Sequence, residues 1–223
     1  MPIEPTYPMR INRYLAWKKY ATRRGADKLI EAGLVLVNGR GAKIGEVINE
    51  KDQVAVRQTK KPKAYTYVAY HKPRGTITHS PIPNLFPVGR LDKDSSGLLL
   101  LTDDGRITDR LLNPDHTHEK EYVVTTREPL RSNFVRQMSS GVVIDDYTTR
   151  LCQVESINDY TFRITLTEGK KHQIRQMCAA LSVTVNELTR LRIMNIRLGQ
   201  LTAGSHRPLT TPELSTFLKS LGL

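Results

Sequence analysis

The first quarter of the chain places short apolar runs among basic positions, in a pattern that predicts two helices followed by strands. Apolar residues at helical spacing predict one helix over Arg10–Lys18 and a second over Arg23–Ala32, which Gly33 is placed to end. The apolar run Leu34–Val37 is typical of a strand, and the Asn38-Gly39 pair after it is a strong signal for a two-residue hairpin turn. We therefore expect a small α/β unit here.

Beyond residue 65 the pattern changes to short runs rich in β-branched and aliphatic residues, separated by turns. We expect strands over Tyr67–Tyr70, Gly97–Thr102, Tyr122–Thr126, Val142–Ile144, Leu151–Val154 and Thr161–Thr167. We expect helices over Ser132–Ser139, Lys171–Leu181 and Pro212–Leu221. Strands in runs, with helices interspersed and no regular alternation, indicate an α+β fold with a mixed or antiparallel sheet.

A polar, basic and apolar-poor stretch over residues 58–65 separates these two regions and is typical of a linker. A chain of 223 residues is long enough for one or two domains, each with its own core. We therefore divide the chain into a small domain over residues 1–57, the linker, and a larger domain over residues 66–223.

The positive charge is concentrated in the small domain and the linker. The chain carries a formal net charge of +12 at pH 7, and a soluble chain this basic usually binds a polyanion. Residues 1–65 hold 14 Lys and Arg against 6 Asp and Glu, whereas residues 66–223 hold 20 against 16. This asymmetry predicts a basic binding module attached to a nearly balanced body.

Composition excludes several classes of protein. No apolar stretch approaches the ~18 residues of a membrane span, and Met1–Arg13 lacks the apolar segment of a secretory signal. The two cysteines, Cys152 and Cys178, are too few for a disulfide framework or a cysteine-rich zinc site. We expect a cytoplasmic protein with no membrane partner, and a monomer, since no large exposed apolar face is evident.

The common catalytic motifs of hydrolases and nucleotide-binding enzymes are missing, but one loop is a candidate site. The charged loop Gly89–Gly97, bounded by glycines, leads into the apolar run Leu98–Leu101 and so places Asp92 at the mouth of a buried strand. From this pattern alone, a simple turn in which Asp92 or Asp94 accepts hydrogen bonds from backbone amides remains the alternative.

Two further segments carry candidate side chains. Tyr122 opens a predicted strand, where an aromatic residue can also serve packing alone. In the predicted helix that follows Gly169, Lys171 and Arg175 share a face, and Arg175 lies at the edge of the apolar stripe, where its guanidinium would seek a carboxylate. An Arg on a solvated helix face remains the alternative.

Taken together, these segments resemble the signature of the RsuA-type pseudouridine synthases. The first motif is Gly89-Arg90-Leu91-Asp92 followed by residues 96–105, and Lys120-Glu121-Tyr122 and His172-Gln173-Ile174-Arg175 are similar to the second and third motifs, in the same order. Residues 8–57 resemble an S-four-type RNA-binding domain. Phe86-Pro87, residues 92–95, residues 118–122 and residues 192–195 resemble the RluF branch in particular.

The resemblance implies an isomerase that converts a specific uridine of RNA to pseudouridine. The RluF branch modifies large-subunit (23S) ribosomal RNA and, in some cases, a tRNA anticodon uridine, so these are the RNA partners that the resemblance implies. It gives Asp92 the role of nucleophile, makes Arg175 its expected ion partner, and places Tyr122 against the target ring. The sequence leaves open whether Asp92 attacks the sugar, attacks the ring or only abstracts a proton. The reaction involves no redox change and no net hydrolysis, so we expect no cofactor and no metal.

The resemblance also implies that the basic small domain contacts RNA phosphates, which raises affinity without selecting a sequence. The residues expected to bind RNA are Arg10, Arg13, Lys18, Lys19, Arg23, Arg24, Arg40, Lys43, Arg90 and Lys171.

Two other functions account for part of the pattern. A non-catalytic RNA-binding or ribosome-assembly factor would explain the charge asymmetry, but it has no need of an Asp92–Arg175 pair. A zinc-dependent RNA hydrolase could be built on His116, His118 and the acids beside them, and metal analysis of the purified protein would distinguish it.

Overall fold

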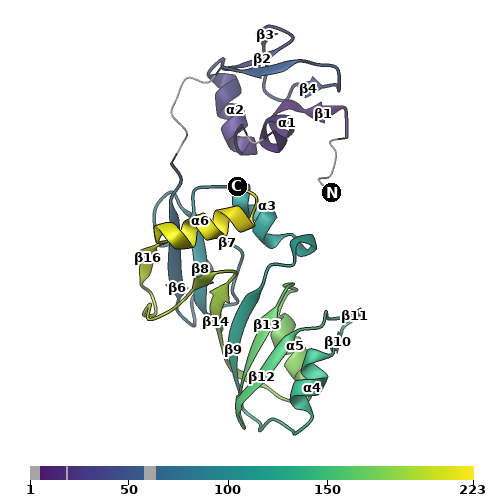
Figure 1. The fold of residues 1–223 in the computed structure, drawn as a ribbon, viewed down its shortest axis with the longest axis vertical. Helices are drawn as coiled ribbons and strands as arrows, with labels where there is room; N and C mark the ends of the chain where they lie inside the picture. Colours follow the sequence, from purple (N-terminus) through teal and green to yellow (C-terminus); the bar gives the residue numbers. More distant parts are fainter. Residues whose placement is uncertain (1–5, 19, 58–63) are drawn as a thin grey trace. The chain divides into compact units, whose positions relative to one another are not determined.

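The computed structural model describes residues 6–18, 20–57 and 64–223. The chain forms two compact units, Met1–Tyr65 with Asp104–Arg106, and Thr66–Asp103 with Ile107–Leu223 (Figure 1). Lys19 and residues 58–63 of the predicted linker lie outside the described residues.

The smaller unit places two helices beside short strands. Its elements are β1 (Met9–Arg10), α1 (Ile11–Trp17), α2 (Arg23–Glu31), β2 (Val35–Val37), β3 (Arg40–Gly41), β4 (Val47–Ile48) and β5 (Val54–Val56). Strands β3, β2 and β5 form one sheet in that order, and β1 pairs with β4. Both predicted helices and the predicted hairpin are confirmed, because Asn38 and Gly39 take the positive φ angles of a tight turn between β2 and β3.

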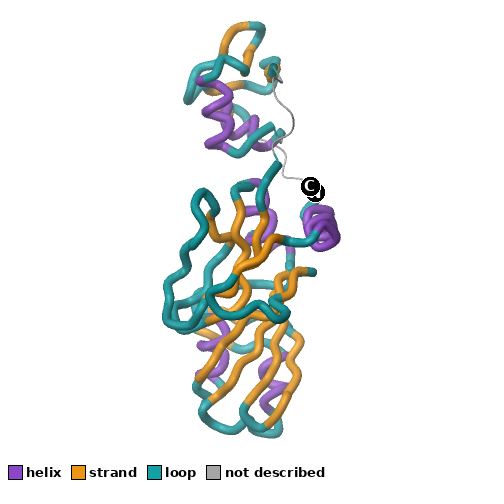
Figure 2. Tube along the Cα trace, turned by 90° about the vertical axis from the view of Figure 1, so that its left-hand side faces the viewer, coloured by secondary structure: helices purple, strands orange, loops and turns teal. Residues whose placement is uncertain are grey.

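The larger unit is organised around a nine-stranded mixed sheet, whose strands run side by side in Figure 2. Its main path follows the order β12, β13, β9, β14, β8, β6, β16, with β15 on β14 and β7 on β8. Strands β14 and β8 are parallel. The strands are β6 (Tyr67–Lys72), β7 (Phe86–Val88), β8 (Ser96–Thr102), β9 (Lys120–Thr126), β12 (Gln153–Asn158), β13 (Thr161–Leu166), β14 (Val185–Ile193), β15 (Ile196–Arg197) and β16 (His206–Pro208).

Helices and a small hairpin complete this unit. They are α3 (Arg106–Leu112), the 3-10 turn η1 (Pro114–His116), α4 (Phe134–Ser139), the β10 (Val143–Ile144) and β11 (Tyr147–Thr148) hairpin, α5 (Gln173–Ala180) and α6 (Thr211–Ser220). Apolar side chains of α4 and α5 pack against those of β9, β13 and β14. Figure 1 shows both helices beside this part of the sheet. The rings of Phe134 and Phe162, whose centroids lie 4.9 Å apart, meet edge to face in this core.

The predicted α+β class with a mixed sheet is confirmed, but several elements differ from the prediction. The strand predicted over Leu151–Val154 begins at Gln153 and continues to Asn158. The long strand β14 and helix α3 were not predicted at all. In β14 the register shifts between Val185 and Glu187 and again between Arg190 and Arg192, so its apolar residues lose the period of two that identifies a strand.

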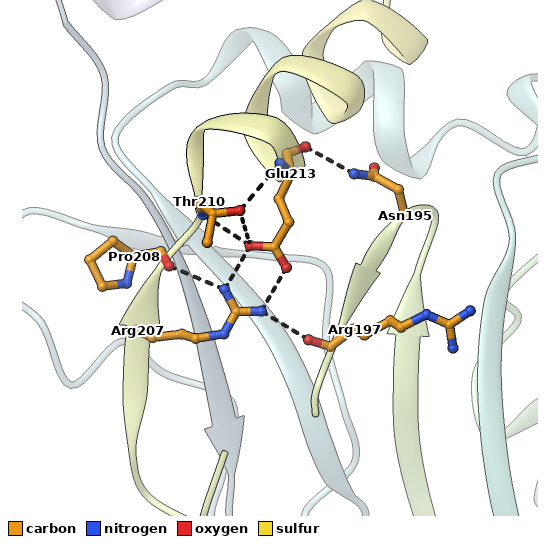
Figure 3. Close-up of polar contacts among 6 residues, drawn as sticks. All are labelled: Asn195, Arg197, Arg207, Pro208, Thr210 and Glu213. Atoms are coloured by element: carbon orange, nitrogen blue, oxygen red, sulfur yellow. Dashed lines mark hydrogen bonds and ion pairs between the residues drawn. The ribbon is translucent and has the colours of Figure 1, made fainter. Parts of the chain in front are cut away.

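A polar clamp fixes the C-terminal helix α6 to the sheet (Figure 3). The guanidinium of Arg207 donates to both carboxylate oxygens of Glu213, at 2.7 and 2.8 Å, and to the backbone oxygen of Arg197. Glu213 also forms a capping box with Thr210, and the Asn195 side chain donates to the Glu213 backbone oxygen at 2.9 Å. These contacts fasten the helix start to β15 and β16.

Among the helices of the described residues, none is both long and apolar enough to cross a bilayer.

Candidate active site

A cavity of about 520 Å³ opens in the larger unit, between the loop before β8, the start of α5, and strands β9 and β14. This volume is in the range of about 300–1,000 Å³ that is usual for small-molecule sites. Of the residues that the sequence singles out, Arg90, Asp92, Tyr122 and Lys171 all line it. The sheet therefore brings three separate chain segments to one cavity.

The loop that carries Asp92 is held on both sides by hydrogen bonds to its backbone. The Thr78 hydroxyl accepts from the Leu91 amide at 3.0 Å and donates to the Leu91 carbonyl at 2.7 Å. On the other side, the Gly75 amide donates to the Lys93 carbonyl at 2.8 Å. Both neighbours of Asp92 are thus fixed, which limits where its carboxylate can lie.

The side chain of Lys72 supports the same loop through hydrogen bonds to backbone carbonyls. The side chain is only 1% exposed, and its Nζ donates to the carbonyls of Pro73, Thr76 and Lys93 at 2.9, 2.6 and 3.4 Å. Burial lowers the pKa of Lys72, while the charges of Asp92 and Asp94 raise it in part. A buried cation that satisfies three carbonyls is therefore an internal tie for the loop.

The prediction that Asp92 forms an ion pair with Arg175 is wrong. Among the described residues, the ion pair of Asp92 is with His172, whose Nε2 lies 3.3 Å from Oδ1. Arg175 instead donates through Nη2 to the Asp94 carbonyl at 3.1 Å and the Ser95 hydroxyl at 3.3 Å. The helix start decides this, because His172 precedes α5 with a left-handed backbone (φ 54°) and aims its ring at the loop.

Gly97 sets how closely the strand after this loop approaches its neighbour. It has a φ of 108°, and a Cβ atom there would lie 2.3 Å from the backbone oxygen of Arg190. Only glycine fits this close, positive-φ position. The contact fixes β8 against β14 directly behind the Asp92 loop.

Tyr122 belongs to the sheet face that forms the floor of the cavity. It lies opposite Arg190 on β14 and Ile164 on β13, and its strand neighbour two residues away, Lys120, also lines the cavity. Burial and then the nearby charge of Arg190 lower the pKa of Lys120. The floor therefore combines one aromatic ring with two cations.

A buried carboxylate anchors the segment between β13 and α5. Glu168 accepts hydrogen bonds from the Tyr147 hydroxyl at 2.6 Å, the Gln173 amide group at 2.6 Å and the Arg150 backbone at 3.0 Å. Burial would raise the pKa of Glu168, but these hydrogen bonds outweigh it and leave the pKa below its ordinary value. The cluster holds Lys170, Lys171 and His172 at the rim of the cavity.

The cations expected to bind RNA in the smaller unit are exposed wherever they are described. Those are Arg10, Arg13, Lys18, Arg23, Arg24, Arg40 and Lys43. They do not all stand free, because Arg40 donates to Glu46 at 2.6 Å and Lys18 lies over the Trp17 ring. The predicted contribution of Lys19 lies outside the described residues.

The two histidines considered for zinc, His116 and His118, stack with ring centroids 5.8 Å apart. In the part of the chain that the structure describes, no group of three or more His, Cys, Asp or Glu side chains is arranged to hold a metal ion.

Three residues at the cavity were not singled out from the sequence. His172 and Lys120 lie inside motifs that were recognised, so their motif positions were a usable signal. No sequence signal pointed to Arg190, because it belongs to β14, where register shifts interrupt the alternation of apolar and polar residues.

Two family models match the chain. Residues 80–180 match the model described as RNA pseudouridylate synthase, and residues 9–54 match the S4 domain model. The first match contains the Asp92 loop, Tyr122 and the start of α5, and the second lies within the smaller unit.

Curated relatives are similar over nearly the whole chain. A protein of Escherichia coli strain K12 named dual-specificity RNA pseudouridine synthase RluF is 36% identical over 96% of this chain and 80% of its own. The ribosomal small subunit pseudouridine synthase A of Pasteurella multocida is 32% identical over 95% of this chain and all of its own. A crystal structure of a pseudouridylate synthase aligns with a TM-score of 0.69 and 30% identity, covering 96% of this chain and 99% of that chain.

Proposed function

The chain belongs to the RNA pseudouridine synthases, which are isomerases, and from this premise we propose that it converts a specific uridine of large-subunit ribosomal RNA to pseudouridine with Asp92 as the nucleophile. The observation that carries the assignment of Asp92 is its place on a loop tied at both neighbours, at a cavity floored by Tyr122.

The reaction detaches uracil from ribose and reattaches it through ring carbon five. The bond from C1′ to N1 breaks, and C1′ forms a new bond to C5, which loses its proton while N1 gains one. Atoms and electrons balance within the nucleotide, so the step needs neither a redox cofactor nor water as a reactant. A carboxylate suits the role of nucleophile toward an electron-poor sugar carbon, because an Asp92 oxygen that bonds to C1′ as N1 leaves can be released again when C5 bonds to C1′.

The surroundings of Asp92 support this role. Nε2 of His172 lies 3.3 Å from Oδ1 of Asp92 and helps to fix the position of the carboxylate. We propose that Arg175 acts as a positioning residue, because its guanidinium donates to the Asp94 carbonyl and the Ser95 hydroxyl and not to the Asp92 carboxylate. Tyr122 would stack on the extruded ring, which must leave its helix to reach the cavity.

We assign RNA affinity to the domain of residues 1–57, joined by the linker of residues 58–65 to the catalytic domain of residues 66–223. The match to the S4 domain model and the exposed cations of the smaller unit support this division. Arg90 and Lys171, both exposed at the cavity, would contact the phosphates beside the target nucleotide.

The substrate proposal follows the relatives. The relative named dual-specificity favours two RNA targets, and we propose a tRNA anticodon uridine as the second substrate. A second relative is named for the small ribosomal subunit, so small-subunit ribosomal RNA is the alternative substrate.

Pseudouridine mapping tests the proposal. Transcripts of large-subunit RNA, small-subunit RNA and tRNA are incubated with the full chain, and tritium release from 5-tritiated uridine is measured. We expect release from large-subunit RNA at one mapped position, and none with Asp92→Asn. Release from small-subunit RNA alone would overturn the substrate assignment, and activity of Asp92→Asn near the wild-type level would falsify the nucleophile.

A further inference from the structure

Two cations in the floor of the cavity have no acidic partner among the described residues. Arg190 is 4% exposed, and Lys120 is partly buried beside Tyr122. Arg190 donates through Nε to the Leu98 carbonyl at 2.7 Å, and Lys120 donates to the His118 carbonyl at 3.1 Å. Nη2 of Arg190 has no hydrogen-bond partner within the described part of the chain. An unsatisfied buried donor in a native protein requires an explanation.

A bulge aims Arg190 into the cavity. Residues two apart on a regular strand share a face, so Arg190 and Arg192 would normally point the same way. The register of β14 against β9 shifts between them, so Arg190 lies opposite Tyr122 while Arg192 lies opposite Glu121. Cross-strand partners share a face of the sheet, which puts the two arginines on opposite faces.

On the other face, two cations of these strands are paired with acids. Arg192 contacts Glu119 at 3.0 Å and Glu121 at 3.2 Å, and Arg163 contacts Glu121 at 3.7 Å and Glu155 at 2.9 Å. The same strands thus supply acids to cations on one face and withhold them on the cavity face. Within the residues that the structure describes, Arg190 and Lys120 therefore lack an acidic partner because they face the cavity.

We propose that Arg190 and Lys120 form an anion subsite that stabilises the negative charge on the uracil ring while it is detached from the ribose. This inference rests on the proposed function. When the bond from C1′ to N1 breaks, its electron pair stays with the ring and spreads onto the carbonyl oxygens. The charge disappears once C5 has bonded to C1′ and lost its proton, and N1 has gained one.

The depth of the two cations favours the ring over a backbone phosphate as the anion. Exposed Arg90, Lys170 and Lys171 at the rim are available to phosphates. Burial and the neighbouring Arg190 charge already lower the pKa of Lys120, and a bound anion would relieve that penalty. Preorganised donors aimed at developing charge commonly supply a large part of catalysis.

Single-turnover kinetics on an RNA fragment with the mapped uridine tests this subsite. We expect Arg190→Gln and Lys120→Met each to slow the chemical step ~100-fold, as removal of one oxyanion donor does, with RNA affinity within about 3-fold of wild type. Arg190→Lys keeps the cation and should retain more activity than Arg190→Gln. Arg192→Gln, on the paired face of the same strand, is the matched control and should react at close to the wild-type rate.

A second substrate separates chemistry from disturbed packing, since Arg190 also supports the Leu98 carbonyl. Fluorine at ring carbon five withdraws electrons and makes uracil a better leaving group. With 5-fluorouridine at the target position, Arg190→Gln should therefore lower the rate of glycosidic cleavage by a smaller factor than it does with uridine. Disturbed packing would lower the rate by the same factor with both substrates.

Equal losses on both substrates, or wild-type rates for Lys120→Met and Arg190→Gln, would overturn the inference. Loss of RNA affinity with an unchanged chemical step would overturn it in favour of a phosphate contact. An inactive wild-type chain on every RNA tested would instead overturn the proposed function.

Discussion

The cations of the smaller unit and two cations of the larger unit, Lys72 and Arg190, differ in how far they are exposed to solvent. Arg10, Arg13, Arg23 and the other described cations of the predicted RNA surface are exposed, whereas Lys72 and Arg190 are almost completely buried. Exposed cations attract phosphates through a field that salt screens, and buried ones act at fixed positions on single groups. Lys and Arg side chains of one chain can therefore contribute to RNA affinity where they are exposed and to the chemistry of the site where they are buried.

Loss of the nucleophile should separate turnover from RNA affinity most strongly, because it removes the chemical step and leaves the cations that bind RNA in place. We expect Asp92→Asn to lower turnover by roughly 1,000-fold or more, since Asn cannot supply a carboxylate nucleophile. Tritium release measures turnover, and filter binding of the same RNA should give a dissociation constant near that of wild type. Parallel loss of binding would mean that Asp92 serves affinity instead.

Removing the buried lysine under the loop should have the next largest effect. Lys72→Met leaves the Thr76 carbonyl without its side-chain donor and leaves the Pro73 carbonyl with the Thr76 hydroxyl alone, which we expect to cost roughly 2–5 kcal/mol in the free energy of unfolding. Turnover should fall in the fraction that remains folded, because the Asp92 loop loses its tie. Urea denaturation checks stability, and Lys171→Met, at an exposed lysine, is expected to leave stability unchanged. Unchanged stability of Lys72→Met would contradict the internal tie.

Charge removal in the smaller unit should do the reverse, weakening affinity without affecting chemistry. The full chain with Arg23→Gln and Arg24→Gln should bind RNA roughly 10-fold more weakly at low salt, with a shallower dependence of log affinity on log salt. The rate of the bound complex should not change. Lys51→Gln, an exposed lysine of the same unit outside the predicted set, is the control. An identical salt slope in both proteins would remove these arginines from the RNA surface.

The clamp on α6 should give the smallest effect, confined to stability. The guanidinium of Arg207 and the backbone of Thr210 lower the pKa of Glu213 to about 2. Because the folded pKa is below the unfolded one, the stabilisation is complete above about pH 4.5 and is lost as the pH falls toward 2.

Replacing Glu213 with Gln should therefore cost about 1–2 kcal/mol at pH 7, by removing the fork and the cap. The cost should shrink as the solution is acidified, which thermal unfolding of both proteins from pH 7 to pH 3 measures. A pH-independent difference between them would show that packing, and not the carboxylate charge, is what the substitution removes.

Local sequence signals located most of the elements that the site uses. Helices α1 and α2 and the Asn38-Gly39 turn follow from patterns that their own residues carry. The same holds for the loop that brings Asp92 to the mouth of a buried strand. Each depends on neighbours a few residues away, so the order of residues along the chain is sufficient.

The partners inside the cavity depend on contacts between distant segments. No local pattern indicates that His172, and not Arg175, faces Asp92, because a single left-handed residue at the start of α5 decides it. The bulge in β14 likewise turns Arg190 toward Tyr122 and breaks the periodicity that would have identified the strand.

The sequence by itself determined helices α1 and α2, the hairpin, the loop of Asp92 and the excess of positive charge in the first unit. The tertiary structure alone decided which side chains meet and which cations stay unpaired. The physical reason is range, since backbone propensity acts between neighbours, whereas register, bulges and burial are set by strands that lie far apart in the chain.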